Sequence, residues 1–379
     1  MVEFFLDLFD VLGNDLRQVV EDSRISGQIL ASFNSTFIAL IPKSDNALSL
    51  NEYKPISLCN CIYKVVSKII ARRLKVILSE HISKEQFGFL EGRQIHEAIG
   101  VAREGLHSLQ TKNLKGLVLK IDLSKAYDKV SWLYIILLLT HLGFGIAFIR
   151  WIMSCITTVS FSVLINGATS PFFHVERGLR QGCPLSPLLF LLVTEGLSRA
   201  IKEAKAQGRF KGVQIVQNLF ITHLLFVDDV LIFCSGTRGD TRVLQEILDL
   251  FSKVIGMEIN AEKSTLSTHL LRHEEVEELT RVFPFNTTCL DEGLTYLGFS
   301  LKANMHLKKD WSWLIGKVKK RLKVWSHKWL SRAGRLVLVK SVLEAIPVYW
   351  MFLSWIPKGI LERVRRICFR FLWSGKKDE

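Results

Sequence analysis

The sequence predicts an α+β fold followed by an all-helical segment, and three observations carry the prediction. The chain has 379 residues and 49% of them are hydrophobic, so it can bury substantial cores. Short apolar runs typical of strands alternate with segments of helical periodicity up to about residue 302. From about residue 308 onward the pattern is helical and basic. Strands interleaved with helices, then helices alone, indicate an α+β region with a helical appendage.

The first half of the chain is predicted as helices around single strands. Residues 1–33 have the pattern of an amphipathic helix, with breaks at Gly13-Asn14 and at Ser26-Gly27. Within 60–80 the apolar residues recur at three- and four-residue spacing, which is typical of a helix. Segments 37–42 and 117–121 are short and rich in branched side chains, which is typical of strands. We expect a strand at 37–42, a helix at 60–80 and a buried strand at 117–121.

The second half repeats this alternation. Segment 132–153 is the most membrane-like, but Gly143 and Gly145 break it, and a membrane helix needs about 20 predominantly apolar residues. We therefore expect a helix, a turn and a second helix there. Asn166-Gly167 indicates a hairpin turn, and Pro187 favours a helix start. The remaining expected elements are strands at 161–165 and 294–301 and helices at 187–200 and 240–255.

Charge and cysteine usage limit the partners and the compartment. The net charge of +14 favours a polyanionic partner, which is nucleic acid or an anionic membrane surface. The seven cysteines lack paired spacing, which predicts reduced thiols in an intracellular protein and argues against a zinc site. The N-terminus has no basic leader before its apolar residues, so we expect no signal peptide.

An acidic pair stands between two strand-like runs. Asp228 and Asp229 separate 219–226 from 230–234, which places them at the tip of a predicted hairpin. Adjacent carboxylates repel one another unless a cation lies between them, although aspartate is also common in ordinary turns. Asp122 ends another predicted strand. Carboxylates from two strands aimed at one point are what a two-metal phosphoryl-transfer site requires, and Mg²⁺ suits such oxygen ligands.

Several segments around these acids occur in a specific order. They resemble the palm motifs of the reverse transcriptase family, in its LINE-type (non-LTR) retrotransposon branch, and two upstream segments are similar to the fingers motifs of that family. Lys54 stands where the family usually has arginine, and Val227 stands where this branch more often has alanine. The palm-like segments are 122–130, 178–190, 227–229, 256–264 and 296–299, and the fingers-like segments are 53–60 and 86–89.

The resemblance implies a right-hand polymerase with fingers, an antiparallel palm and a helical thumb. It places an N-terminal helical extension at 1–35 and the fingers, with the start of the palm, at 36–115. The palm, with fingers insertions, follows at 116–302, and a truncated, basic thumb or connection follows at 303–379. The implied activity is RNA-directed DNA polymerisation on an RNA template with a DNA primer and deoxynucleoside triphosphates.

The resemblance also implies roles for single residues. Asp122 and Asp228 hold two Mg²⁺ ions, with Mn²⁺ as an alternative, Asp229 assists them, and Lys263 is the general acid for pyrophosphate. Tyr127 is the steric gate under the sugar, or alternatively a core tyrosine. The remaining nucleotide contacts are Gln181 and Gly182, with a helix-entry loop at Arg180-Gln181 as the alternative, and some of Lys54, Lys64 and Arg72. For Lys263 the alternative is a solvated charge.

The basic tail fits the implied thumb. Segment 317–340 has nine lysines or arginines and no acidic residue, whereas a solvated helix face normally mixes both signs. Basic side chains on phosphates give sequence-independent, salt-sensitive affinity. Trp325 and Trp329 share a helix face and are expected in the thumb core. The expected nucleic-acid contacts are Lys317, Lys320, Arg321, Lys328 and Arg335.

Two other functions remain open from the sequence. The same motifs fit a catalytically inactive, nucleic-acid-binding remnant of a retroelement, and the basic tail alone fits a membrane-surface protein. Full elements of this kind carry an endonuclease before the polymerase, whereas only about 35 residues precede the fingers-like segment here. We therefore expect a separate endonuclease partner, no membrane partner and a nuclear location.

Overall fold

The chain folds into two compact units. The computed structural model describes residues 2–304, 306–325, 330–351 and 354–374. The first unit comprises 1–94 and 115–288, and the second comprises 95–114 and 289–379. Residues 95–114 and 289–302 group with the C-terminal helices, and the division into extension, fingers, palm and thumb stays a prediction.

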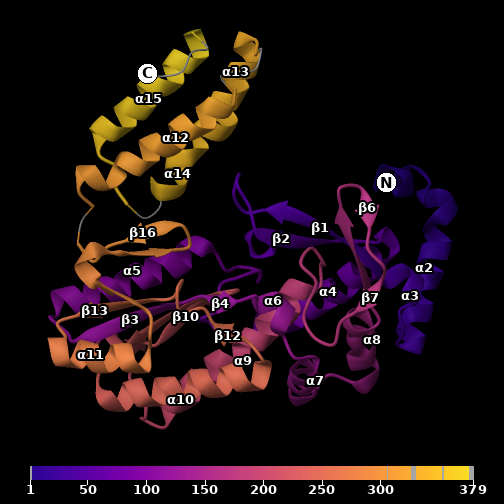
Figure 1. The fold of residues 1–379 in the computed structure, drawn as a ribbon, viewed down its shortest axis with the longest axis horizontal. Coiled ribbons are helices and arrows are strands. Elements are labelled where there is room, and N and C mark those ends of the chain that lie inside the picture. The colour runs from indigo at the N-terminus through magenta and orange to yellow at the C-terminus, as the bar shows by residue number, and fades with distance from the viewer. Residues whose placement is uncertain (1, 305, 326–329, 352–353, 375–379) are drawn as a thin grey trace. The chain divides into compact units, whose positions relative to one another are not determined.

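A five-stranded sheet, here called the central sheet, forms the middle of the first unit. Its strand order is β10-β11-β3-β13-β14, and β3 is antiparallel to both of its neighbours (Figure 1). Apolar residues on both faces of β3 explain its central place, since Leu119 and Ile121 on one face and Val118 on the other are all at most 1% exposed. The strands are β3 (Gly116–Ile121), β10 (His223–Phe226), β11 (Asp229–Cys234), β13 (Thr265–His269) and β14 (Asn286–Cys289).

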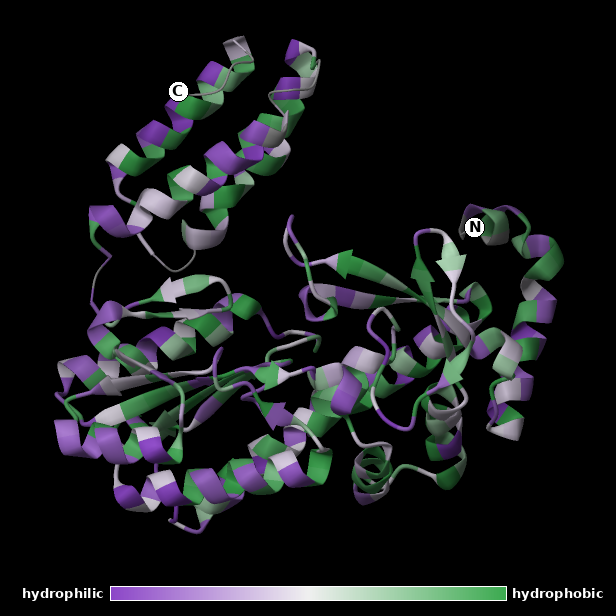
Figure 2. Ribbon diagram, viewed as in Figure 1, coloured by the Kyte–Doolittle hydropathy of each residue, from purple (hydrophilic) through white to green (hydrophobic). Residues whose placement is uncertain are grey.

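Two long helices cover one face of the central sheet. α9 (Ser186–Ala206) and α10 (Arg238–Ile255) pack against each other beneath the strands (Figure 1). Pro187 lies in the first turn of α9, where its missing N–H costs nothing, and α10 ends at Gly256, whose φ of 77° is left-handed. In Figure 2 α10 carries both hydrophobic and hydrophilic residues, as an amphipathic helix does.

A second sheet, here called the outer sheet, lies beside helices of the N-terminal region. β1 pairs antiparallel with β2 and parallel with β5, and β5 also pairs with β6 and β7. The side chain of Asn60 accepts a hydrogen bond from Ile62 N and caps the helix α4. The strands are β1 (Ser35–Pro42), β2 (Tyr53–Cys59), β5 (Ser160–Ile165), β6 (Ala168–Thr169) and β7 (Phe173–His174).

The remaining elements complete the first unit. The helices are α1 (Val2–Asp7), α2 (Phe9–Ser26), α3 (Ala31–Asn34), α4 (Cys61–His81), α6 (Ala126–Lys129), α7 (Trp132–His141), α8 (Ile146–Thr157) and α11 (His273–Val282), with a 3-10 turn at Leu50–Glu52. The strands are β4 (Leu123–Ser124), β8 (Val213–Val216), β9 (Leu219–Ile221) and β12 (Glu258–Ile259).

The second unit is mainly helical. The hairpin β15 (Leu294–Tyr296) and β16 (Phe299–Leu301) packs on α5 (Ile95–Thr111), and α15 contacts both α12 and α13. The remaining elements are α12 (Ser312–Trp325), α13 (Arg332–Leu338), a π-helical turn (Val339–Leu343), α14 (Ala345–Met351), α15 (Lys358–Ser374) and 3-10 turns at Leu290–Glu292 and Lys308–Trp311.

Most predicted elements are confirmed, and three predictions are wrong. α2 runs through Gly13-Asn14 without a break, because a glycine inside a helix costs only about 1 kcal/mol relative to alanine and does not by itself end it. The predicted strand 219–226 divides into β9 and β10, which pair with different partners. The predicted strand 294–301 is a hairpin that turns at Leu297-Gly298, both with positive φ. Within the described residues, no helix is long and apolar enough to cross a membrane.

Candidate active site

Asp122 is held by its backbone at the end of β3. Its N–H donates to Ser264 Oγ at 3.1 Å, and its carbonyl oxygen accepts from Asn260 N at 2.8 Å. β4, directly after Asp122, pairs with β12. The segment predicted as the fourth palm motif therefore fixes the position of the first candidate carboxylate.

Asp228 and Asp229 come from the β10–β11 hairpin. Phe226 pairs with Asp229, so Val227 and Asp228 form a two-residue turn, as the acidic pattern predicts. On its other side β11 pairs with β3, with Val230 opposite Ile121. The next pair in this register is Asp229 and Asp122, which brings the acids from both strands to one end of the central sheet.

The three acids form an electrostatically coupled group. Burial raises the pKa of Asp228, its own backbone amide lowers it, and the negative charge of Asp122 raises it again. Burial also raises the pKa of Asp229, and the charges of Asp228 and Asp122 add to that rise. Asp228 nevertheless remains solvent-exposed, so its carboxylate is accessible to a substrate. The negative charges of the described acids therefore act on one another at this end of the central sheet.

Two lysines act on these acids through their charge. Lys54, on β2, lowers the pKa of Asp228, and Lys120, on β3, lowers the pKa of Asp229. Lys54 was predicted as a triphosphate contact. Lys120 is not among the predicted residues, because a single lysine within an apolar strand belongs to no recognisable motif.

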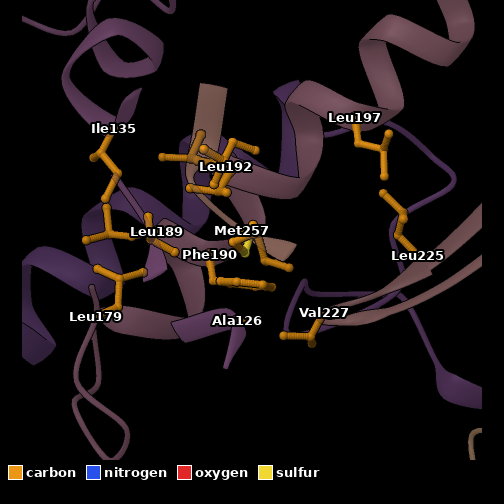
Figure 3. Packing of buried hydrophobic residues seen from close by; sticks show 14 of the residues in the cluster. Ala126, Ile135, Leu179, Leu189, Phe190, Leu192, Leu197, Leu225, Val227 and Met257 are labelled. Atoms are coloured by element: carbon orange, nitrogen blue, oxygen red, sulfur yellow. The ribbon is translucent and has the colours of Figure 1, made fainter. Parts of the chain in front are cut away.

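Tyr127 lies beside the acids on α6. Its ring stacks on Phe190 with centroids 4.7 Å apart and planes 9° apart, and Leu179 N donates to its carbonyl oxygen at 2.6 Å. Burial raises the pKa of the Tyr127 hydroxyl, and the negative charge of Asp228 raises it further. The hydroxyl is therefore a neutral donor near Asp228, on a half-buried ring that is supported from one side. Figure 3 shows Phe190 in the buried cluster with Ala126 and Met257.

Gln181 lies in the loop before α9. Its carbonyl oxygen accepts from Ser57 N at 2.8 Å, which joins the loop to β2. Its side chain hydrogen-bonds to Asp128, which lowers the pKa of that carboxyl against a larger rise from burial. Among the described residues, no partner meets the buried Gln181 Oε1. A cavity of about 210 Å³ borders the loop and is lined by Pro55, Ser57, Asp128 and Gln181, among others.

Gly182 requires the absence of a side chain. Its φ is +100°, and an added Cβ would lie 3.0 Å from Ser57 O. We expect Gly182→Ala to lower the stability of the protein by about 1–3 kcal/mol, because alanine is strained in this conformation. Thermal unfolding measures this. Gly145→Ala is the matched control, since no atom lies within 4 Å of its added Cβ and its φ of −63° is ordinary. Equal melting temperatures would contradict the prediction.

The neighbouring Arg180 is a structural residue. The sequence leaves it within a substrate-facing or helix-entry loop, but its side chain is only 5% exposed. It donates to Thr36 Oγ1 at 3.1 Å and to Cys155 O at 2.7 Å, and its guanidinium carbon lies 3.9 Å from the Tyr63 ring centroid. Arg180 therefore joins the outer sheet to α4 and α8.

The other basic candidates are exposed and make few contacts. Lys64 and Arg72 lie on the solvent side of α4, and Lys263 lies in the loop after β12. Within the described residues, no hydrogen bond or ion pair joins these three side chains to Asp122 or Asp228. Their roles at the triphosphate stay predictions.

The predicted thumb residues lie in the second unit, where their positions differ. Lys317, Lys320 and Arg321 are exposed on α12, and Lys317 Nζ lies 5.9 Å from the Trp350 ring centroid. Arg335 instead donates to Phe371 O and Leu372 O, so it anchors α13 to α15. Lys328 and Trp329 lie outside the described residues. The ring centroids of Trp325 and Phe371 lie 6.4 Å apart, in agreement with a core role for Trp325.

The carboxylates fit a divalent cation that brings further ligands with it. In the described part of the chain, no three histidine, cysteine, aspartate or glutamate side chains form a complete cation cluster. Mg²⁺ typically uses one or two carboxylates and completes its shell with water and substrate phosphates. Asp122 and Asp228, with raised charge density and solvent access at Asp228, match that donor set.

Curated relatives of this chain come from non-LTR retrotransposons. A Xenopus laevis protein named "Transposon TX1 uncharacterized 149 kDa protein" is 27% identical over 380 residues, which is 99% of this chain and 28% of that protein. The Pol polyprotein of the Drosophila melanogaster element R2DM is 27% identical, over 62% of this chain and 22% of the relative. The RNA-directed DNA polymerase of the Drosophila funebris element jockey is 25% identical, over 58% and 23%. The chain thus spans about a quarter of the length of these relatives.

A solved structure shows the fold of this chain, and a family model shows its family. The telomerase of Candida albicans, in complex with a fragment of telomeric RNA, matches 89% of this chain and 56% of its own with a TM-score of 0.52 and 12% identity, which shows a polymerase-like α+β fold. Residues 41–301 match the model described as "Reverse transcriptase (RNA-dependent DNA polymerase)". Because that match covers more than half of the chain, the protein belongs to the reverse transcriptase family, in the branch of LINE-type (non-LTR) retrotransposons.

Proposed function

We propose that this chain is an RNA-directed DNA polymerase that extends the 3′-hydroxyl of a DNA primer on an RNA template. The observation that carries the proposal is the meeting of Asp122, from the end of β3, with Asp228, from the tip of the β10–β11 hairpin. Nucleotidyl transfer, the reaction of the family, needs oxygen ligands from separate strands at one point.

Asp122 and Asp228 would hold the divalent ions, and Asp229 would add negative charge behind them. Mg²⁺ is the ion that we propose, with Mn²⁺ as an alternative. When bound, such ions neutralise the phosphates and align the attacking and leaving oxygens. In the reaction the primer oxygen bonds to the α-phosphorus of a deoxynucleoside triphosphate, the bond to pyrophosphate breaks, and the hydroxyl proton is lost.

The surrounding residues would bind and orient the nucleotide. Tyr127 limits the space at the sugar, and Gln181 offers its unpartnered amide oxygen from a loop that Gly182 keeps close to β2. Lys54, whose charge already reaches Asp228, is the best supported triphosphate contact. We also propose Lys64 and Arg72 as triphosphate contacts and Lys263 as the general acid for the leaving pyrophosphate.

The exposed basic face of α12 would bind the backbone of the primer–template duplex. We expect the triple variant Lys317→Gln, Lys320→Gln and Arg321→Gln to weaken duplex binding and to lower the slope of log K against log salt by about 2–3, since each phosphate contact contributes about 0.7–0.9. Fluorescence anisotropy over a salt series measures the slope. Replacing the exposed Lys112, in the turn after α5, by glutamine is the single-charge control. An unchanged slope in the triple variant would remove α12 from the interface.

A primer-extension assay tests the proposed function. The purified chain should incorporate deoxynucleotides on an RNA template when Mg²⁺ or Mn²⁺ is present. If it binds the duplex but extends no primer with either ion, the chain is the inactive nucleic-acid-binding remnant instead. A separate endonuclease partner and a nuclear location remain proposals that this assay does not address.

A further inference from the structure

The segment 85–88 supports the acidic turn from outside the hairpin. β10 is the edge strand of the central sheet, and this segment runs parallel along its free edge. Leu225 N donates to Glu85 O at 2.8 Å, and Phe87 N donates to Leu225 O at 2.8 Å. The hairpin that carries Asp228 is therefore held on both sides, by β11 and by segment 85–88.

The Gln86 side chain connects this segment to the turn and to α9. It is fully buried, and its Oε1 accepts from Gly88 N at 3.0 Å and from Val227 N at 3.1 Å. Its Nε2 donates to Thr194 Oγ1 at 3.2 Å. A single buried amide thus fixes the backbone of the turn against a long core helix.

Val227 gives this support a purpose, because its backbone conformation is unfavourable. Its φ is 61°, and it is the first of two central residues in the hairpin turn, a position where the favoured turn types require positive φ and where glycine is preferred. A β-branched residue is strained there and keeps the conformation only when its surroundings enforce it. The Val227 side chain is buried and joins the cluster around Phe190 (Figure 3).

Gly88 completes the arrangement by leaving room for the turn. An added Cβ at Gly88 would lie 2.5 Å from Val227 Cγ2 and 3.1 Å from Val227 N. The turn backbone can therefore approach Gln86 only because residue 88 has no side chain. Gln86, Gly88 and Thr194 together enforce one conformation of Val227.

We propose that Gln86 is a positioning residue of the polymerase site, which holds Val227 in its left-handed conformation and thereby aims the carboxylate of Asp228. Asp228 follows Val227 directly, so a change in the Val227 backbone rotates the Asp228 side chain away from Asp122. The proposal rests on the proposed polymerase function for its activity measurement, but not for its measurement of the turn itself.

The activity test uses Gln86→Met, which keeps the length of the side chain and removes both hydrogen-bonding groups. We expect kcat for nucleotide incorporation to fall about tenfold to a hundredfold, since small misplacements of catalytic groups have effects of that size. The Kd for the primer–template should change by less than about twofold, because the duplex contacts are elsewhere. Gln18→Met is the matched control on the exposed face of α2, where kcat should not change.

A second measurement needs neither metal nor substrate. In metal-free Gln86→Met, hydrogen exchange at the Val227 and Gly88 amides should accelerate about tenfold or more, while the β3 amides remain protected. Unchanged protection of Val227 would overturn the proposal even if the wild-type chain extended no primer. A wild-type chain without activity but with the expected exchange pattern would instead remove only the proposed function.

A double-mutant cycle separates positioning from general loss of stability. Glycine adopts a positive φ freely, so in Val227→Gly the turn can keep its conformation without the Gln86 contacts. In the protein with the native Val227, we expect Gln86→Met to reduce kcat about tenfold or more. In the Val227→Gly background, the same substitution should reduce kcat less than about threefold. Equal effects in both backgrounds, in proteins that stay folded, would show that Gln86 only stabilises the core.

Discussion

Replacing Asp228 with asparagine is expected to reduce primer extension at least about a thousandfold, which corresponds to about 4 kcal/mol of lost transition-state stabilisation. Asparagine keeps the size of the side chain but removes the negative charge that a divalent cation requires. The turn should be retained, because the contacts that hold it are made by Val227 and its neighbours rather than by the Asp228 carboxylate. Rates measured with Mg²⁺ and with Mn²⁺ test the expectation.

The same substitution should not lower the melting temperature of the metal-free protein. The pKa values of Asp228 and Asp229 are raised in the folded state, so their charged forms reduce stability at neutral pH. That penalty disappears as the pH falls toward their unfolded values. Asp228→Asn should therefore melt at or above the wild-type temperature at pH 7, with the difference shrinking in acid. Mg²⁺ should raise the melting temperature of the wild type more than that of the variant.

Asp249→Asn provides the control for this pair of measurements. Asp249 is exposed on α10, so the same chemical change should alter neither extension nor melting. Extension by Asp228→Asn at a rate similar to the wild type would show that the site is assigned wrongly. A large fall in its melting temperature would mean that lost activity reflects unfolding.

The acids of the site could be predicted because their signal is local. Asp122 follows an apolar run that only a buried strand explains, and Asp228 stands between two such runs. The pairing of β3 with β11 then follows from the need to bury both strands. The fixed order of the family motifs singles out the same residues among the aspartates of the chain. The structure brings them to one end of the central sheet.

What supports the acids could not be predicted, because it depends on contacts between distant segments. Gln86 and Val227 are 141 residues apart, and no periodicity links a buried glutamine to one turn. Arg180 is a charged residue in a loop and would be expected at the surface, yet it is buried against the outer sheet and α4. The hairpin at Leu297-Gly298 replaces the predicted strand because Gly298 favours a turn within an otherwise strand-like apolar run.

Tyr127→Val is expected to lower the preference for deoxynucleotides over ribonucleotides about tenfold to a hundredfold. The Tyr127 ring is rigidly placed, because it stacks on Phe190 and its backbone is held by Leu179. Its hydroxyl lies within electrostatic reach of Asp228, so a nucleotide bound at Asp228 as proposed would have its sugar beside this ring. Excluding a single small group by packing is worth about 1–3 kcal/mol, and this sets the expected size of the change.

The comparison of Tyr127→Val with Tyr127→Phe distinguishes a steric gate from a core tyrosine. Phenylalanine keeps the ring and its stacking on Phe190, so a gate should remain closed and the ratio of kcat/KM for the two nucleotide types should stay within about threefold of wild type. Valine removes the ring and opens the space at the sugar. If Tyr127 only fills the core, valine should lower the melting temperature while leaving that ratio unchanged, because lost packing weakens both substrates equally. A changed ratio in valine alone therefore assigns the ring to nucleotide selection.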